Sequence, residues 1–229
     1  MGYDLRMPSR PKRATEPARP GGRSGPDVHI STTRQLILEK AEQLFAERGI
    51  AAVPLRDIGL AAGQKNNAAV QYHFGDRASL LKAIILYRAA TSERVRAEQL
   101  ANPIASHEPA QVRDLVKAFI LSLAGHLRDG HYYLAFLSRY IVEYGGYAGL
   151  EGAVSSSTVT TFMSLLYRLL PDHRESVLDE RWMIIMMTTV HTLARYQTAL
   201  RAGTLPAPLP ELLDDLADFL AGGIIAVHG

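Results

Sequence analysis

The sequence contains no cysteine, which excludes disulfide bonds, thiolate zinc sites and cysteine nucleophiles together. It also lacks an uncharged run of about 18 apolar residues, which a membrane-spanning helix requires. Its first residues lack the apolar centre of a signal peptide. We therefore expect no contact with a membrane and predict a cytoplasmic protein.

Recognisable catalytic and metal-binding patterns are also missing. The eight histidines include no HxxxH or HExxH pair, which would place two imidazoles on one face of a helix. We therefore predict no metal and no cofactor. No phosphate-binding loop, GxGxxG motif or Ser-His-Asp spacing occurs, and Asp214 and Asp215 are neighbours that point apart on a helix. An all-helical enzyme and a protein-interaction module remain as alternatives to the function predicted below.

The chain of 229 residues is 47% hydrophobic, which suffices for a full core. Its charge is divided unevenly. Residues 1–90 carry 14 Lys and Arg against 8 Asp and Glu, whereas residues 91–229 carry 11 against 15. A basic N-terminal part favours binding to phosphates, although such charge also keeps a tail soluble. We predict that residues 1–30, rich in Pro and Gly, form a disordered basic arm.

After this arm the sequence predicts helices almost throughout. Ser31, Thr32 or Thr33 can cap a first helix, which Gly49 ends. Further helices are expected at residues 55–62, 67–73, 77–101, 110–127, 131–144, 155–170, 175–202 and 210–227, separated by Gly, Pro and Asp punctuation. In this series Asn66 and Asp76 are predicted to cap the third and fourth helices.

The second and third of these helices form a predicted helix-turn-helix, with Gly63 in the turn. The second helix of such a unit lies in the major groove and presents amides and small side chains to base edges. Asn67, Ala68 and Gln71 face the groove if Ala69, Val70 and Phe74 face inward. An ordinary helical hairpin with a polar turn has a similar sequence.

Residues 37–85, ILEKAEQLFAERGIAAVPLRDIGLAAGQKNNAAVQYHFGDRASLLKAII, resemble the DNA-binding domain of TetR-type transcriptional regulators. The resemblance lies in AxxLFxxxG, in RDIGLAAG and in the YHFGDRxxLL junction. It implies an all-α fold, with a DNA-binding domain at residues 31–78 and a helical ligand-binding and dimerisation domain at residues 79–229. It further implies a regulator, expected to be a repressor, that a small-molecule effector releases from an inverted-repeat operator in double-stranded DNA. The middle of the predicted ligand-binding domain has few Arg or Lys residues apart from Arg139 and Arg195, which favours an uncharged or amphipathic effector, and we expect a small, largely apolar molecule.

The resemblance assigns contacts to particular residues. The predicted DNA-binding residues are Arg56, Lys65, Asn67, Ala68, Gln71, Tyr72, His73 and Arg77. Among them Asn67, Ala68 and Gln71 read bases, Tyr72 and His73 lie near phosphates, Arg56 reads a base in some members, and Arg77 meets a phosphate. Alternatively, Arg56 pairs with Asp57, and His73 packs beneath the fourth helix.

The resemblance also implies a homodimer that forms through the last two helices, although helices buried within a monomer have a similar composition. An effector is expected among aromatic and methionine side chains, which line adaptable pockets but more often form plain core. The predicted ligand-binding residues are Tyr133, Phe136, Tyr140, Phe162, Met163, Tyr167, Met183, Met187 and His191.

Overall fold

The computed structural model describes residues 26–64, 68–105, 111–128, 130–146 and 157–226. Within these ranges the chain forms nine α-helices and no β-strand, so the predicted all-α fold is confirmed. The helices are α1 (Pro26–Arg48), α2 (Leu55–Ala61), α3 (Ala69–Phe74), α4 (Arg77–Ala105), α5 (Val112–Ala124), α6 (Tyr133–Tyr144), α7 (Ser157–Leu169), α8 (Glu175–Ala202) and α9 (Leu209–Ile225).

The first helix begins earlier than its sequence predicts. α1 starts at Pro26, inside the segment expected to be a disordered arm, so the predicted cap at Ser31–Thr33 is wrong. Proline suits the first position of a helix because it lacks the N–H that would have no partner there. The predicted cap of α4 is confirmed, since the Asp76 carboxylate accepts a hydrogen bond of 2.7 Å from the Ser79 backbone N–H. The predicted cap of α3, Asn66, lies outside the described residues.

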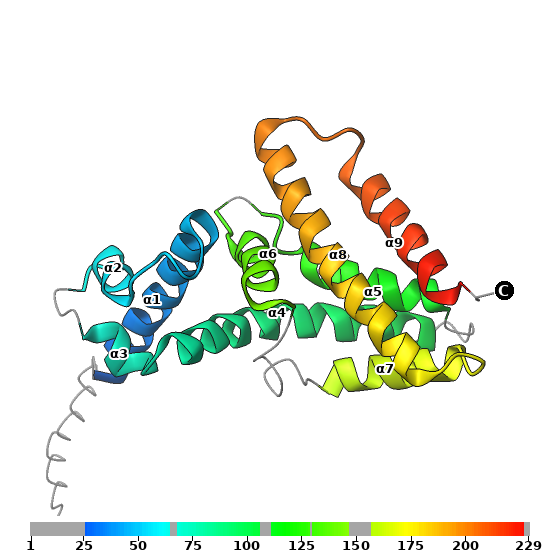
Figure 1. Ribbon diagram of the computed structural model, residues 1–229, viewed down its shortest axis with the longest axis horizontal. Helices are drawn as coiled ribbons and strands as arrows, with labels where there is room; N and C mark the ends of the chain where they lie inside the picture. The colour runs from blue at the N-terminus through cyan, green and yellow to red at the C-terminus, as the bar shows by residue number, and fades with distance from the viewer. Residues whose placement is uncertain (1–25, 65–67, 106–110, 129, 147–156, 227–229) are drawn as a thin grey trace, which may run out of the picture.

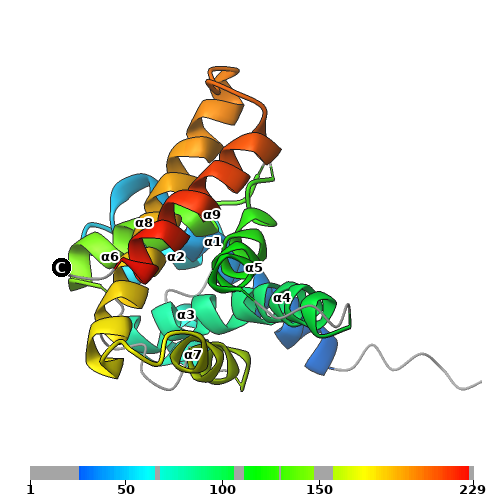
Figure 2. The same cartoon turned by 90° about the vertical axis from the view of Figure 1, so that its right-hand side faces the viewer.

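The helices form two groups that α4 connects (Figure 1). The short helices α2 and α3 lie with α1 at one end of the molecule, and α4 runs from α3 into the larger group. In that group α8 and α9 form a long pair, and α5 packs against both α4 and α9. After a quarter turn of the view, α9 lies in front of α8 (Figure 2).

Buried apolar side chains continue from one group of helices into the other. Ile58 and Val70 are buried in the small group, while Leu134 and Leu193 are buried in the large one. The two groups meet where α1 contacts α6. There the rings of Phe45 and Phe136 stack with centroids 6.2 Å apart. The small group is therefore packed directly against the large one, as well as joined to it by α4.

Candidate DNA-binding surface and effector domain

The helix-turn-helix consists of α2 and α3. Gly63 follows α2 with a φ of +70°, a left-handed conformation that glycine adopts without steric cost. Val70 and Phe74 of α3 are buried, as the sequence predicts, and Gly59 of α2 lies beneath Val70. A Cβ atom on Gly59 would lie 3.6 Å from the Val70 side chain, so the two helices pack closely at this point.

The outer face of α3 consists of predicted DNA-binding residues. Ala68 and Gln71 are exposed, and the Tyr72 side chain is 80% exposed, with its ring against the edge of the His73 ring. His73 itself is half-buried and its ring lies beside that of Phe74. Lys65 and Asn67 lie outside the described residues. The arrangement therefore leaves a polar and aromatic face of a short helix open on the surface, with its apolar face in the core.

The two predicted arginines have partners within the protein. Arg56 forms an exposed ion pair with its neighbour Asp57, Nε to Oδ1 3.2 Å, which is the alternative considered for it in the sequence. Arg77, at the start of α4, donates from Nη1 to the Ile50 carbonyl and lies 5.8 Å from the centre of the Phe45 ring. Arg77 therefore holds the loop between α1 and α2, a role that the sequence does not reveal.

Other basic side chains lie near the same surface. Arg34 of α1 is exposed, and its guanidinium covers the Phe74 ring at 4.9 Å from the centroid. Together with Lys82 and Ser79 of α4 it lines a shallow cavity of about 400 Å³. Arg34 and Lys82 are the cations that sequence reasoning missed. Their spacing along α1 and α4 carries no local pattern, because only the packing of these helices brings them together.

A carboxylate from the large group holds the loop that precedes α2. Glu143, near the end of α6, accepts hydrogen bonds from the backbone N–H groups of Ile50 at 2.9 Å and Ala51 at 3.0 Å. Because Arg77 binds the Ile50 carbonyl, the same peptide segment is held from α4 as well as from α6. The position of α2 thus depends on both groups of helices.

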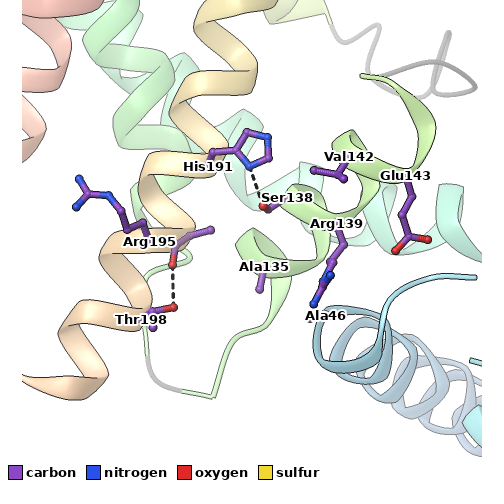
Figure 3. A pocket seen from close by; sticks show the side chains of 10 residues that line it. Ala46, Ala135, Ser138, Arg139, Val142, Glu143, His191, Arg195 and Thr198 are labelled. Carbon is purple, nitrogen blue, oxygen red and sulfur yellow. Dashed lines mark hydrogen bonds between the residues drawn. The ribbon is translucent and has the colours of Figure 1, made fainter. Parts of the chain in front are cut away.

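A cleft of about 410 Å³ opens beside this contact, between α1, α6 and α8. Figure 3 shows Arg139 and Glu143 on α6, with His191 and Arg195 on the facing turns of α8. The Ser138 hydroxyl and His191 Nδ1 lie 2.8 Å apart and connect α6 to α8 (Figure 3). His191 is the only predicted ligand-binding residue that lines this particular cleft.

The other predicted ligand-binding residues lie in or against the core of the large group. Tyr133, Phe136, Tyr140 and Phe162 are buried. Met163, Tyr167 and Met187 are partly buried and pack against them, and Met183 is half-buried on α8. Tyr167 also donates a hydrogen bond to Asp179, which, as the largest effect, raises the pKa of its phenol to about 12. Their role in binding an effector stays a prediction.

The last two helices expose an apolar surface. Phe219 of α9 is 72% exposed and Ile184 of α8 is 48% exposed. Both line a cavity of about 580 Å³ between α8 and α9 that also includes Gly222 and Gly223. Arg181 of α8 closes one end of it by donating to the Ile224 carbonyl at 2.7 Å.

Two family models match this chain. Bacterial regulatory proteins of the tetR family match residues 37–84, which span most of α1 through the start of α4. The tetracyclin repressor-like C-terminal domain matches residues 113–223, from α5 into α9. The chain belongs to the TetR family of transcriptional regulators. Proteins of this family bind operator DNA, respond to small molecules, typically dimerise, and are not enzymes.

Solved structures share the fold at low sequence identity. The fatty acid degradation regulator FadR from Bacillus halodurans is 15% identical, with a TM-score of 0.53 over 88% of this chain and 98% of its own. A protein from Mesorhizobium loti assigned to the TetR family is 16% identical, with a TM-score of 0.50 over 87% of this chain and 98% of its own. Among curated protein sequences, none matches this chain significantly.

The described residues lack two further kinds of site. Within them, no helix is both long and apolar enough to cross a membrane. The same part of the chain holds no cluster of three or more His, Asp or Glu side chains placed to bind a metal ion.

Proposed function

We propose that this regulator is a repressor that binds an inverted-repeat operator as a dimer and leaves it when a small, largely apolar effector binds. The observation that carries the DNA-binding part is the outer face of α3, where Ala68, Gln71 and Tyr72 are exposed while Val70 and Phe74 anchor the helix. A protein that binds the bacterial chromosome acts in the cytoplasm, as the sequence predicts.

On the proposed surface, Gln71, Ala68 and Asn67 read base edges in the major groove, and Tyr72 and His73 lie along its phosphates. Arg56 of α2 and Lys65, which lies outside the described residues, contribute further contacts to DNA in this proposal. Arg34 and Lys82 add phosphate contacts at the start of α4, where their cavity faces the same end of the molecule. Arg77 supports the surface by holding the Ile50 carbonyl.

The dimer forms through α8 and α9. Exposed Phe219 and Ile184 lie on the surface that these two helices share, and a second copy of the chain would bury both. Gly222 and Gly223 carry no side chains that would hold the partner's helices away. Two α3 helices related by a two-fold axis then meet successive major grooves about 34–36 Å apart, which requires an operator with inverted symmetry.

The effector binds in the large group of helices, among the predicted residues of α6, α7 and α8 and above α4. A ligand that prefers one position of α6 or α4 changes the position of the loop at Ile50, because Glu143 and Arg77 hold it from these helices. The coupling is reciprocal, so operator DNA weakens effector binding by the same factor, about 5- to 150-fold in allosteric proteins.

Footprinting across the DNA around the protein's own gene tests the proposal. We expect one protected inverted repeat. On that site Gln71→Ala relaxes sequence preference, because a good bidentate base contact contributes about 1–3 kcal/mol of discrimination. Lys82→Ala serves as the matched comparison, since losing a phosphate contact weakens specific and random DNA alike. If Gln71→Ala, like Lys82→Ala, lost the same affinity for specific as for random DNA, the assignment of α3 as the base-reading helix would be contradicted.

Arg77→Ala separates the contact role of this residue from its support role. Loss of a phosphate contact alone lowers affinity for all sequences and leaves the fold intact. Because Arg77 also holds Ile50 and covers Phe45, we expect the variant to melt at a lower temperature than Lys82→Ala. Equal melting temperatures for the two variants would show that the support is dispensable.

A further inference from the structure

An arginine lies buried in the middle of the large group of helices. Arg96 of α4 is 8% exposed. Its Nη1 donates to Glu93 Oε2 at 3.0 Å and its Nη2 to the Ser122 hydroxyl at 3.4 Å. Glu93 is itself 29% exposed, one turn away on the same helix, so the carboxylate that pairs with Arg96 in the described part of the chain lies at the margin of the core.

A second polar contact joins the same two parts of the chain. Ser92 Oγ and His126 Nε2 lie 2.9 Å apart, and both residues are buried. Ser92 precedes Arg96 by four residues, and Ser122 precedes His126 by four. The two contacts therefore lie about one helical turn apart, between α4 on one side and α5 with the turn that follows it on the other. The ring of Tyr133, from α6, meets that of His126 edge-on at 4.7 Å.

This buried cluster retains unused hydrogen-bonding groups. Among the described residues, neither Arg96 Nε nor His126 Nδ1 has a hydrogen-bond partner. Buried polar atoms are nearly always satisfied, so an exception calls for an explanation. Burial, as the largest effect, lowers the pKa of both side chains, and for Arg96 it does so against the opposing charge of Glu93. The cost of burying an ion is several kcal/mol unless a partner compensates it.

Aromatic rings lead away from the cation. The Arg96 guanidinium lies 5.7 Å from the centre of Phe119, and Phe119 meets Trp182 with ring centroids 5.0 Å apart. Trp182 in turn lies 4.4 Å from Phe162, one of the predicted ligand-binding residues. A positive group therefore lies at one end of a row of contacting aromatic rings from α5, α8 and α7.

We propose that Arg96, with His126 beside it, binds the acidic group of the effector, whose apolar body lies along Phe119, Trp182 and Phe162. The effector is then an amphipathic acid, and its carboxylate or a similar anion accepts hydrogen bonds from Arg96 Nε and His126 Nδ1. This inference rests on the proposed effector site in the helical domain. Beyond that proposal, it specifies that the effector carries a negative charge.

The test compares decanoate, decan-1-ol and decylamine, which share one chain and differ only in the head group. Trp182 is the only tryptophan, so its fluorescence reports binding of each probe to the full-length protein without DNA. A hydrogen-bonded ion contributes about 1.5–3 kcal/mol, so decanoate should bind about tenfold to 100-fold more tightly than the alcohol. The amine should bind most weakly. Equal affinities for acid and alcohol, or no binding of any probe, would overturn the proposal.

Arg96→Met removes the charge and keeps an apolar side chain of comparable length. We expect this variant to lose the preference for decanoate and to keep or raise its melting temperature, because apolar replacement of a poorly paired buried ion is often neutral or stabilising. Arg94→Gln is the matched control, since Arg94 lies on the same helix with its side chain 71% exposed. It should keep the full preference. The same preference in Arg96→Met as in the wild type would overturn the proposal.

Arg96→Lys keeps the experiment decisive if Arg96→Met does not fold. Lysine retains the charge without the planar fork of donors, so the preference should fall but persist; an undiminished preference overturns the proposal. Footprinting gives an independent result. A protein that prefers decanoate but protects no operator contradicts the proposed function alone, whereas operator binding without any preference contradicts only the acidic effector.

Discussion

The half-buried Arg88 and the buried Glu42 form a two-pronged ion pair that joins α4 to α1. Arg88 Nε lies 2.7 Å from Glu42 Oε2, and its Nη2 lies 3.0 Å from Oε1. The Tyr132 backbone N–H, just before α6, also donates to Glu42 at 3.2 Å. Burial, the largest single effect, would lower the pKa of the Arg88 guanidinium, but the hydrogen bond and charge of Glu42, together with the charges of Tyr87 and Glu39, raise the pKa overall. One carboxylate thus organises three helices between the DNA-binding and effector parts.

Glu42→Gln should destabilise the fold, because it leaves the half-buried Arg88 guanidinium without its counter-charge. Removing one partner of a buried ion pair costs about 3–5 kcal/mol. Urea unfolding of the variant and the wild type measures this difference. Glu98→Gln is the control, since Glu98 belongs to an exposed pair with Arg94 on α4 that should contribute about 0.3–0.5 kcal/mol. Similar losses in the free energy of unfolding for the two variants would show that the Glu42 ion pair contributes no more stability than an exposed pair.

Gly49→Ala should disturb the loop that α6 holds. Gly49 has a φ of +89°, and a Cβ atom there would lie 3.1 Å from Glu143 Oε1, which binds the Ile50 N–H. The variant therefore combines backbone strain of about 1–2 kcal/mol with displacement of a hydrogen-bonding carboxylate. We expect a lower melting temperature and weaker DNA binding.

Gly203→Ala separates the two effects of that substitution. Gly203 ends α8 with a φ of +66°, and no atom lies within 4 Å of a Cβ placed there. This control should show the backbone strain alone and leave DNA affinity unchanged. If Gly49→Ala loses no more DNA affinity than Gly203→Ala, the contact between Glu143 and the loop does not position α2.

Local signals allowed much of this fold to be predicted from the sequence. Helices end at Gly49, Gly63 and Gly203, where the backbone has a positive φ that glycine adopts readily. A single glycine in the sequence is therefore enough to indicate a helix end. The same reasoning failed at the start of α1, where Ser31–Thr33 resemble a cap but Pro26 begins the helix. Caps and turns depend on residues that are neighbours in the chain, which explains why many of them can be predicted from one sequence.

Burial of charged residues could not be predicted in the same way. Glu42 and Arg96 occupy helical positions where charged side chains usually face water, and only the packing of α1, α4 and α5 buries them. By contrast, Arg139 and Arg195, which line the cleft between α6 and α8, are both exposed. The pattern on α3 was easier to interpret, because Val70 and Phe74 alternate with exposed Gln71 and Tyr72 over a single turn.

Acid should weaken the fold through His126. Burial, as the largest effect, together with the nearby positive charges of Arg88, His131 and Arg128, lowers the pKa of His126 from 6.5 to about 4. The unfolded chain then binds a proton that the folded chain does not, so stability is complete above about pH 6.5 and falls as the pH drops toward about 4. The loss across that interval is about 3 kcal/mol.

Denaturant unfolding of the wild type and of His126→Gln between pH 5 and 7 measures this contribution. Glutamine can still bond to Ser92 but does not titrate, so the stability of the variant should depend less steeply on pH. Identical slopes in the two proteins would place the titrating group elsewhere. Carboxylates protonate mainly below this interval and affect both proteins alike.

Phe219→Asp should convert the dimer to monomers and weaken operator binding. Phe219 is 72% exposed in the single chain but lies in the apolar surface that we assign to the partner, so a charge there would be buried without compensation. Val142→Asp is the matched control, because Val142 is 71% exposed but lies on α6, away from α8 and α9's shared surface. Light scattering at micromolar concentration should give a dimer for the wild type and for Val142→Asp, and a monomer for Phe219→Asp. Because one α3 helix then meets only half of the operator, the monomer should bind a half-site as well as it binds the full inverted repeat. A dimeric Phe219→Asp that binds the operator normally would move the interface to another face of the molecule.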